Sequence, residues 1–455
     1  MAEELDFDFR GFGNTDVRKD PAAQTGASAK PGKNGKTDKT DKNGKDAKSG
    51  KTGKSGKGDK PDKRKGDKDK HRKDGKAKDH KAKDHGKHAG KPALFEPMTL
   101  RGLTVRNRVW LPPMDTYSVF ECDGKPTQFH YQHYVSRALG GFGMVIVEAT
   151  AVCPEGRISP HDVGLWEDGQ IDSWRWIAEG IKETGATAAI QLNHAGRKGS
   201  TGCFGLGYIA NTVPEEAGGW PTVAPSEVAY GRYATPRALS VDEIHGITWA
   251  FAAAARRAVE AGFQAIEIHA AHGYLISQFL DPLSNVREDE YGGNFEGRIR
   301  FLVETVDAVR SVIPGDMPLL VRVSATDWAA GGWDLDQTVA LAKVLKDHDV
   351  DLVDVSTGGI VSGVSVPVKP KYQVPFAQQV RSRADVPVTA VGLITKPKEA
   401  ERILEKGEAD AVEIGRAALR DPYWPLRAAY KLGVPKAEAP YPSPYVRGAY
   451  GTGVH

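Results

Sequence analysis

Residues 265–274 read AIEIHAAHGY, an apolar run that ends in two histidines, a glycine and a tyrosine. Further short apolar runs, many of them β-branched, recur along the chain, and stretches with helical patterning separate them. One such stretch is 241–261, where Ser240 and Glu243 predict a capping box, and another is 298–312. We predict eight strands, at residues 106–113, 143–149, 188–192, 265–269, 319–324, 352–356, 388–392 and 411–415. Continuous apolar strands that alternate with helices predict a parallel sheet covered on both faces, and eight such units predict a closed (β/α)8 TIM barrel.

The barrel is expected to be one α/β domain at residues 93–455, which hold all nine tryptophans and all three cysteines and are long enough to build a core. Residues 1–92 contain almost no Leu, Ile, Val or Trp, so they cannot bury enough apolar surface to offset the entropy lost on ordering. We expect them to form a disordered, low-complexity tail that is rich in Lys, Gly and Asp.

The net charge of +3 is an average over two unlike parts. Residues 30–91 hold 24 Lys or Arg against 10 Asp, and a lysine falls at every third position from Lys30 to Lys63, whereas residues 92–455 are acidic. Glycine keeps no strict three-residue period, which excludes a collagen triple helix. The tail is interpreted either as a solvated extended segment or as a polycation that makes non-specific, salt-sensitive contact with a polyanion.

Cysteine usage and hydropathy indicate the compartment. Cys122, Cys153 and Cys203 show none of the paired spacings of a disulfide framework, a zinc knuckle or an iron–sulfur cluster. No run of about 18 apolar residues is present, and the acidic start MAEELDFDF is unlike a secretory signal. We expect a soluble, cytoplasmic protein without a membrane span.

Polar residues follow several predicted strands, at the barrel end where such folds place their chemistry. Gly392 and Gly415, with Arg416, indicate a phosphate site, although any tight turn after a strand also favours glycine. Arg322 lies in an otherwise apolar strand, so its charge requires either a buried carboxylate or an electron-rich partner such as the isoalloxazine ring of a flavin. Gln191 is placed to hydrogen-bond the same edge of such a ring.

His269 and His272 lie three residues apart and have three interpretations. They are a metal pair, for which no third ligand is evident, or two structural histidines, or two imidazole donors for a carbonyl or nitro oxygen. In the last case they stabilise the negative charge that develops on that oxygen as hydride reaches the β-carbon. Tyr274 is then suited to give a proton to the α-carbon, although a loop tyrosine often only packs.

Four segments carry a resemblance to a known family. They are PMDTYS at 113–118, HAGRK at 194–198, IEIHAAHGYL at 266–275 and FLDPLSNVREDEYGGNFEGRIRF at 279–301. These segments resemble the old yellow enzyme family of NADH:flavin oxidoreductases, and in particular its thermophilic-like branch, which includes bacterial xenobiotic reductases. The similarity runs from about Leu94 to Arg447.

The resemblance implies an FMN-dependent ene-reductase, which uses NADPH or NADH to reduce the activated C=C bonds of small α,β-unsaturated carbonyl or nitro compounds by ping-pong hydride transfer through flavin N5. It implies non-covalent FMN and no metal. Five residues would contact the flavin ring, namely Pro113, Met114, Ala149, Gln191 and Arg322. Four would lie along the ribityl phosphate, namely Ser356, Gly392, Gly415 and Arg416. The substrate would meet His269, His272, Tyr117 and the proton donor Tyr274, and Arg447 would reach a neighbouring subunit of a homo-oligomer.

One position departs from that branch, because Asp115 stands where its members often have a cysteine that tunes the flavin. A carboxylate there would disfavour the anionic reduced ring. An iron–sulfur dienoyl reductase is excluded because it needs a cysteine cluster, and a dihydroorotate-type dehydrogenase would lack HAAHGY. The remaining alternative is a catalytically inactive flavin-barrel scaffold that its basic tail tethers to a polyanion.

Overall fold

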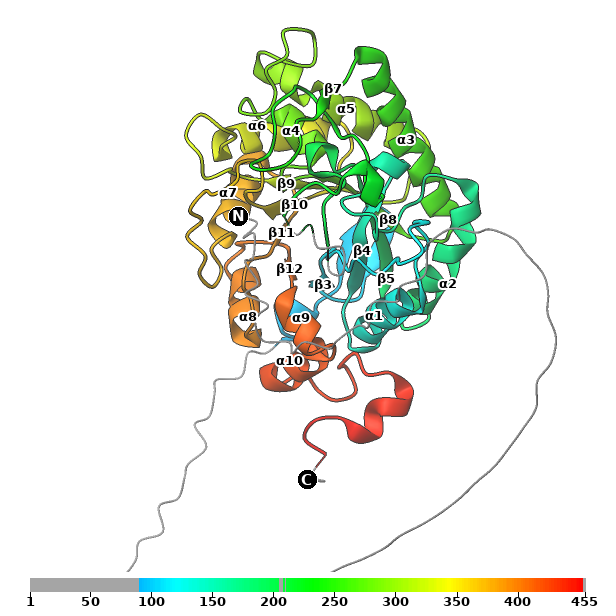
Figure 1. Cartoon of the computed structure of the whole chain (residues 1–455). Helices are drawn as coiled ribbons and strands as arrows, with labels where there is room; N and C mark the ends of the chain where they lie inside the picture. The colour runs from blue at the N-terminus through cyan, green and yellow to red at the C-terminus, as the bar shows by residue number, and fades with distance from the viewer. Residues whose placement is uncertain (1–89, 204–207, 209, 453–455) are drawn as a thin grey trace, which may run out of the picture. The chain divides into compact units, whose positions relative to one another are not determined.

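The computed structural model describes residues 90–203, 208 and 210–452. Eight parallel strands close into a barrel, so the predicted TIM barrel is confirmed, and Figure 1 shows the helices arranged around these strands. The predicted tail lies, up to residue 89, outside the described residues. The barrel strands in spatial order are β10 (Leu352–Ser356), β11 (Val388–Ala390), β12 (Ala411–Glu413), β3 (Val109–Leu111), β4 (Met144–Ala151), β5 (Thr187–Asn193), β8 (Ala265–Ala270) and β9 (Leu319–Ser324).

Each predicted strand falls on one of these strands, and β9 and β10 have the predicted bounds. The first strand is shorter than predicted. Just before β3, the side chain of Asn107 accepts a hydrogen bond from the Val109 amide and donates one to the Gly141 carbonyl, and the Arg108 amide donates to the Leu94 carbonyl. Pro112 follows β3, and proline has no N–H with which to extend the ladder.

Helices cover the outside of the strands. The longer ones are α1 (Gln128–Leu139), α2 (Ile171–Lys182), α3 (Val241–Glu260), α5 (Phe295–Arg310), α6 (Leu335–Asp347), α7 (Val374–Ala384), α8 (Pro397–Glu405) and α10 (Trp424–Leu432). At the start of α3 both bonds of the predicted capping box are present. Helix α5 begins three residues earlier than predicted because the Asn294 side chain caps it by accepting from the Gly297 amide.

Shorter elements lie in the connections. Helices α4 (Leu275–Leu280) and α9 (Arg416–Arg420) follow β8 and β12, and the strands β6 (Val223–Ala224) and β7 (Arg237–Ala238) pair in the connection between β5 and α3. The 3₁₀ turns are η1 (Ala93–Phe95), η2 (Pro154–Gly156), η3 (Asp168–Gln170), η4 (Gly196–Lys198), η5 (Glu215–Ala217) and η6 (Ser443–Gly448). Within the described ranges, none of the helices has the length and apolar character needed to cross a membrane.

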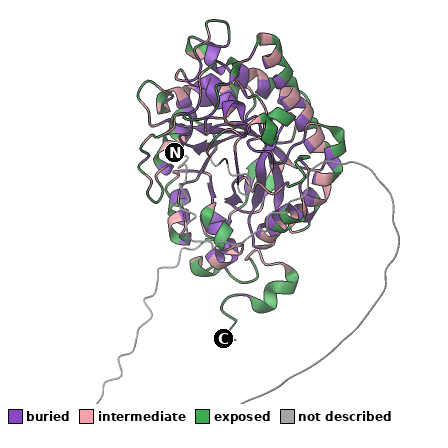
Figure 2. Ribbon diagram, viewed as in Figure 1, coloured by how far each residue is buried: buried purple, intermediate pink, exposed green. Residues whose placement is uncertain are grey.

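A hairpin that the apolar runs did not predict closes the barrel at the end where the strands begin. It consists of the antiparallel strands β1 (Met98–Leu100) and β2 (Leu103–Val105). Its apolar side chains pack against residues from the first positions of the barrel strands, among them Trp110 and Leu352. Figure 2 shows that the strands are almost wholly buried. The open end is therefore the opposite one, where the strands finish.

Candidate active site

The predicted site residues come from all eight barrel strands or the turns that follow them. Because the strands are parallel and the barrel is closed, their carboxyl ends form one rim. The structure therefore brings to this rim Pro113, Met114, Tyr117, Ala149, Gln191, His269, His272, Tyr274, Arg322, Ser356, Gly392, Gly415 and Arg416. Arg447 is the exception, because it lies exposed in η6, which follows the last helix α10.

The imidazoles of His269 and His272 face each other. The Nε2 atom of His269 lies 3.3 Å from Nδ1 of His272, and the two rings are nearly perpendicular. A left-handed backbone at His272, with φ of +58°, brings the second ring back over the first. Burial, and then the charge of Arg322, lowers the pKa of both histidines well below 6.5. Both rings are therefore neutral near pH 7, and each has one N–H to donate.

The backbone of His272 is fixed by its neighbours. Its amide donates to Ser324 Oγ at 2.9 Å, and its carbonyl accepts from Lys198 Nζ at 3.0 Å. A Cβ atom placed on Gly359 would lie 2.3 Å from the carbonyl carbon of His272, and one on Gly273 would lie 2.0 Å from the Gly359 oxygen. Only glycine fits at both positions, so the loops after β8 and β10 interlock at this histidine.

Two tyrosines border the histidine pair. The rings of Tyr274 and His269 meet edge to face with their centroids 4.9 Å apart. Tyr274 and Tyr117 pack against one small apolar cluster that contains Ala149 and Ala195. Burial raises the pKa of the Tyr274 phenol well above 10, so it keeps its proton. The rim thus offers an apolar surface next to two imidazoles and a protonated phenol.

The sequence predicted either a buried carboxylate or a flavin ring as the partner of Arg322, and the structure shows a buried carboxylate. The Arg322 Nε atom lies 2.7 Å from Asp354 Oδ2, and its Nη2 atom lies 3.6 Å from Glu413 Oε2. Nη1 is only weakly bonded, at 3.5 Å from the Pro113 oxygen. Burial opposes the charge, but the carboxylates, Asp354 first, raise the pKa of Arg322 above its ordinary value. One end of the guanidinium is therefore held from within the barrel while Nη1 remains available toward the rim.

The sequence reasoning missed the carboxylates beneath the rim. Glu267, Asp354 and Glu413 are buried at one level of the barrel, and the Gln191 amide donates to Glu267 at 2.8 Å. Burial raises the pKa of Glu267 to about 8 and that of Glu413 well above its usual range, so this layer retains protons at neutral pH. These acids could have been found from the sequence, because each one interrupts an apolar strand. Alternate residues of a strand face the same side, and each acid lies on the side that faces the barrel interior.

Glu148 is another missed residue, and it holds the predicted flavin-contact segment after β3. Its carboxyl group accepts hydrogen bonds from the Tyr134 hydroxyl at 2.6 Å and from the Thr116 amide at 2.8 Å. Next to Thr116, burial and the nearby acids Asp162 and Glu148 raise the pKa of Asp115 well above its usual range. These effects favour the neutral acid over the charged carboxylate expected at Asp115.

The predicted phosphate end has an open backbone. Gly392 has φ of +113° and Gly415 precedes α9, whose first residue Arg416 is exposed. A Cβ atom placed on Gly415 would lie 3.5 Å from the Sδ atom of Met114. The turn after β12 is therefore in contact with the segment after β3. The residues predicted for the two ends of one FMN molecule are thus continuous along the rim.

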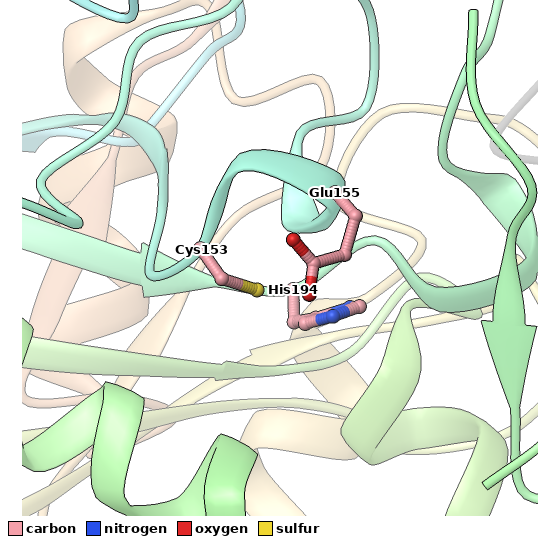
Figure 3. A group of neighbouring side chains, drawn as sticks. All are labelled: Cys153, Glu155 and His194. Carbon is pink, nitrogen blue, oxygen red and sulfur yellow. The ribbon is translucent and has the colours of Figure 1, made fainter. Parts of the chain in front are cut away.

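A second group of metal-ligand types, Cys153, Glu155 and His194, lies beyond β4 and β5 (Figure 3). The Gly196 amide donates to His194 Nδ1 at 3.0 Å, so the neutral ring carries its proton on Nε2. That nitrogen then has no lone pair for a metal. Burial lowers the pKa of His194 to about 4 and raises that of the Cys153 thiol.

Comparisons with known proteins agree with this geometry. The profile of the NADH:flavin oxidoreductase / NADH oxidase family matches residues 93–434. An NADPH dehydrogenase of Geobacillus thermodenitrificans is 47% identical over 348 residues, which is 76% of this chain and 96% of that protein. Morphinone reductase superposes with a TM-score of 0.63 at 29% identity, covering 76% of this chain and 91% of that one. The old yellow enzyme homologue from Zymomonas mobilis gives the same TM-score and identity, covering 76% and 94%.

The barrel and its rim are those of a flavin-dependent oxidoreductase that uses FMN with NAD(P)H as reductant. The chain belongs to the NADH:flavin oxidoreductase / NADH oxidase family, the old yellow enzyme family.

Proposed function

We propose that the enzyme is an ene-reductase, which uses NAD(P)H to reduce C=C bonds conjugated to a carbonyl or nitro group. The observation that carries the proposal is the pair of neutral imidazoles, 3.3 Å apart, beside a protonated phenol. One substrate oxygen bound between His269 Nε2 and His272 Nδ1 receives two hydrogen bonds. These bonds strengthen as the oxygen gains negative charge during the reaction. The morphinone reductase likeness supports the same class of chemistry.

The residues at the rim fit FMN. Arg322 and Gln191 would hold the pyrimidine edge of its ring, with Pro113, Met114 and Ala149 along the ring. Ser356, Gly392, Gly415 and Arg416 would lie along the ribityl phosphate. FMN, when bound, supplies the hydride chemistry, since it accepts hydride from the reduced nicotinamide and passes it to the alkene. Arg322 carries the positive charge that favours the reduced ring.

The side chains of the chain divide the remaining work. His269 and His272 bind and polarise the substrate oxygen, and Tyr117 lines the pocket. Tyr274 holds the proton for the α-carbon, because its raised pKa keeps the phenol protonated until the carbon becomes basic. Glu148 and Glu267 position the groups that contact FMN. Water is kept from the reacting atoms by the apolar cluster around Ala149.

Binding of a phenol to the FMN-loaded protein tests this proposal. A phenolate oxygen mimics the developing oxyanion, and its ring over the flavin gives a charge-transfer absorbance. We expect His269→Ala and His272→Ala each to lower the affinity for the phenol, followed through that absorbance, by about tenfold or more. This is the effect of losing one hydrogen-bond donor to a charged oxygen. Unchanged affinity in both variants contradicts the assignment. Reduction of a small enone by NADPH under anaerobic conditions measures the activity itself.

The finer expectations of the sequence remain proposals. We propose a division at residue 92 between the tail and the catalytic domain, a cytoplasmic location, and a homo-oligomer in which the exposed Arg447 meets a second subunit. We also propose that the tail makes a salt-sensitive contact with a polyanion, because residues 30–91 alone hold 24 Lys or Arg. Deletion of residues 1–92 is expected to leave turnover of a small enone intact and to abolish retention on heparin.

A further inference from the structure

We propose that Ser356 is a positioning residue that supports His272 with its proton on either ring nitrogen, and that the oxyanion site is completed only when this proton changes place. The inference rests on the proposed role of the two histidines. It assigns Ser356 a task at the substrate side, beyond its proposed contact with the ribityl phosphate.

A continuous series of hydrogen bonds defines the tautomers of the ligand-free site. The Ala271 amide, which can only donate, lies 3.2 Å from Nδ1 of His269. Neutral His269 therefore carries its proton on Nε2 and donates it to Nδ1 of His272 at 3.3 Å. Neutral His272 must then carry its proton on Nε2, and that nitrogen lies 2.7 Å from Ser356 Oγ.

The Ser356 hydroxyl completes the series. It accepts from His272 Nε2 and donates to the Gln373 side-chain oxygen at 3.2 Å. That oxygen also accepts from the Thr357 hydroxyl at 2.7 Å, so it stays satisfied when the Ser356 bond is withdrawn. Ser356 is buried, with a relative exposure of 5%, so among the protein's own groups its hydroxyl is confined to these partners.

In this arrangement only one of the two facing nitrogens, His269 Nε2, can donate a hydrogen bond to a substrate oxygen. A carbonyl that replaces the bond between the two rings can accept from His269 Nε2, but it meets the lone pair of His272 Nδ1. Two donors require the other tautomer of His272, with its proton on Nδ1. The Nε2 atom then becomes an acceptor. A hydroxyl suits this change because it has one donor and two acceptor positions, so Ser356 can turn its O–H from Gln373 to Nε2.

The change is one of tautomer and not of charge. The ring loses a proton from Nε2 and gains one on Nδ1, by exchange with water in the open rim, and it is neutral before and after. The charged groups that act on His272 are Arg322 and Lys198, with His269 as its titratable neighbour, and all of them disfavour an imidazolium. An alkyl side chain at position 356 can neither accept from Nε2 nor donate to it.

Nitrogen-15 NMR of the holoenzyme, labelled in histidine, tests the inference directly. Each ring nitrogen is assigned through its coupling to the carbon-bound ring protons, with His272→Asn to identify the signals of His272. We expect a proton on Nε2 in the ligand-free enzyme and on Nδ1 once para-hydroxybenzaldehyde is bound. A proton on the same nitrogen in both states overturns the inference.

Substitutions at position 356 give the second readout. Ser356→Ala leaves the acceptor Nε2 of the ligand-bound tautomer without a donor and is expected to weaken phenol binding about tenfold. Ser356→Thr retains a hydroxyl and is expected to restore most of the affinity. All values are compared at saturating FMN, so that a loss of cofactor is separated from a loss of ligand.

The two proposals fail in distinguishable ways. Weakened binding in the His269 and His272 variants, together with wild-type binding in Ser356→Ala, rejects the role of Ser356 and leaves the ene-reductase proposal standing. Wild-type binding in the histidine variants rejects both. Equal loss in Ser356→Ala and Ser356→Thr, with the ligand-free tautomer unchanged in each, shows a packing role only and also rejects the inference.

Discussion

The Nε atom of Arg322 lies 2.7 Å from Oδ2 of Asp354, and both side chains are buried inside the barrel. Removal of one partner from such a pair costs about 3 to 5 kcal/mol when nothing replaces its charge. Here Glu267 and Glu413 hold protons that they can release, and the pKa of Glu267 is about 8. We therefore expect Asp354→Asn to lower the free energy of unfolding by less than that range, and by least above about pH 8.

Urea denaturation of Asp354→Asn at several pH values measures this compensation. Asp336→Asn is the matched control, since it breaks the exposed pair of Asp336 with Arg383 and is expected to cost about 0 to 1 kcal/mol without a trend in pH. A loss in Asp354→Asn that is constant from acid to alkaline pH contradicts the idea that the buried acids share protons.

The neutral state of Asp115 predicts a null result. If burial keeps this side chain protonated, Asp115→Asn replaces one neutral group by another of similar shape. The midpoint potential of bound FMN, measured by spectroelectrochemical titration near neutral pH, should then match that of the parent. A marked rise in the potential of the variant would show that the parent carries a carboxylate beside the ring.

Glu148 is expected to control cofactor affinity without contacting the cofactor. Glu148→Gln replaces an acceptor by a donor opposite the Thr116 amide or the Tyr134 hydroxyl, which costs about 1 to 3 kcal/mol. We expect weaker binding of FMN, seen by quenching of its fluorescence, and a lower melting temperature. Tyr134→Phe removes one of the same bonds and should reproduce part of the effect. Normal FMN affinity in both variants argues against this role for Glu148.

Stability should depend on the pH through Asp327. Burial, and then its hydrogen bond to Asp281, raises the pKa of Asp327 to about 10, whereas an unfolded Asp titrates near 3.9. The folded chain thus holds a proton that the unfolded chain releases, so this contribution is complete at low pH and is lost as the pH rises from about 4 through about 10. Asp327→Asn should become progressively more stable, relative to its parent, between about pH 6 and about pH 9.

Thermal melts across that pH range give the comparison, with Asp347→Asn as a control at an exposed position of α6. The control should follow its parent at every pH. Parallel curves for Asp327→Asn and its parent would mean that the proton is not retained in the folded state.

Gly359 is expected to be needed for ligand binding rather than for FMN. Gly359→Ala would place a Cβ atom 2.3 Å from the His272 carbonyl carbon, at a φ of +106°, and so must displace His272. We expect the affinity for the phenol to fall at least about tenfold, because the displaced His272 no longer donates its hydrogen bond to the ligand oxygen. Gly363→Ala is the control, since its added Cβ meets nothing within 4 Å although its φ is also positive. Equal effects in the two variants would assign the loss to backbone strain alone.

The apolar runs were sufficient to predict the barrel, because a strand buried on both faces must be apolar throughout, as in β9 and β10. Some rim residues, such as Gly392 and Gly415, followed from the rule that chemistry lies at strand ends, whereas others, such as Ala149, came only from the family resemblance. The hairpin of β1 and β2 escaped, since three-residue strands leave too short a pattern. Glu148 and Glu267 escaped for another reason: their partners, Thr116 and Gln191, are 32 and 76 residues away in sequence.

The tautomer of His272 lay further beyond sequence reasoning. It depends on a left-handed backbone at a residue other than glycine and on a serine 84 positions away. Neither has a local signature, whereas the glycines that permit the fold of the loop, Gly273 and Gly359, are visible but uninformative until their close approach is known.

The floor formed by the β1–β2 hairpin determines where the enzyme can be attached to something else. The described chain enters beside that floor, where the Ala93 and Leu94 amides are bound by Glu401 and the Leu94 carbonyl accepts from the Arg108 amide. A fusion partner, bead or electrode surface joined ahead of Gly90 would therefore lie at the closed end of the barrel, and the rim at the open end would stay unobstructed.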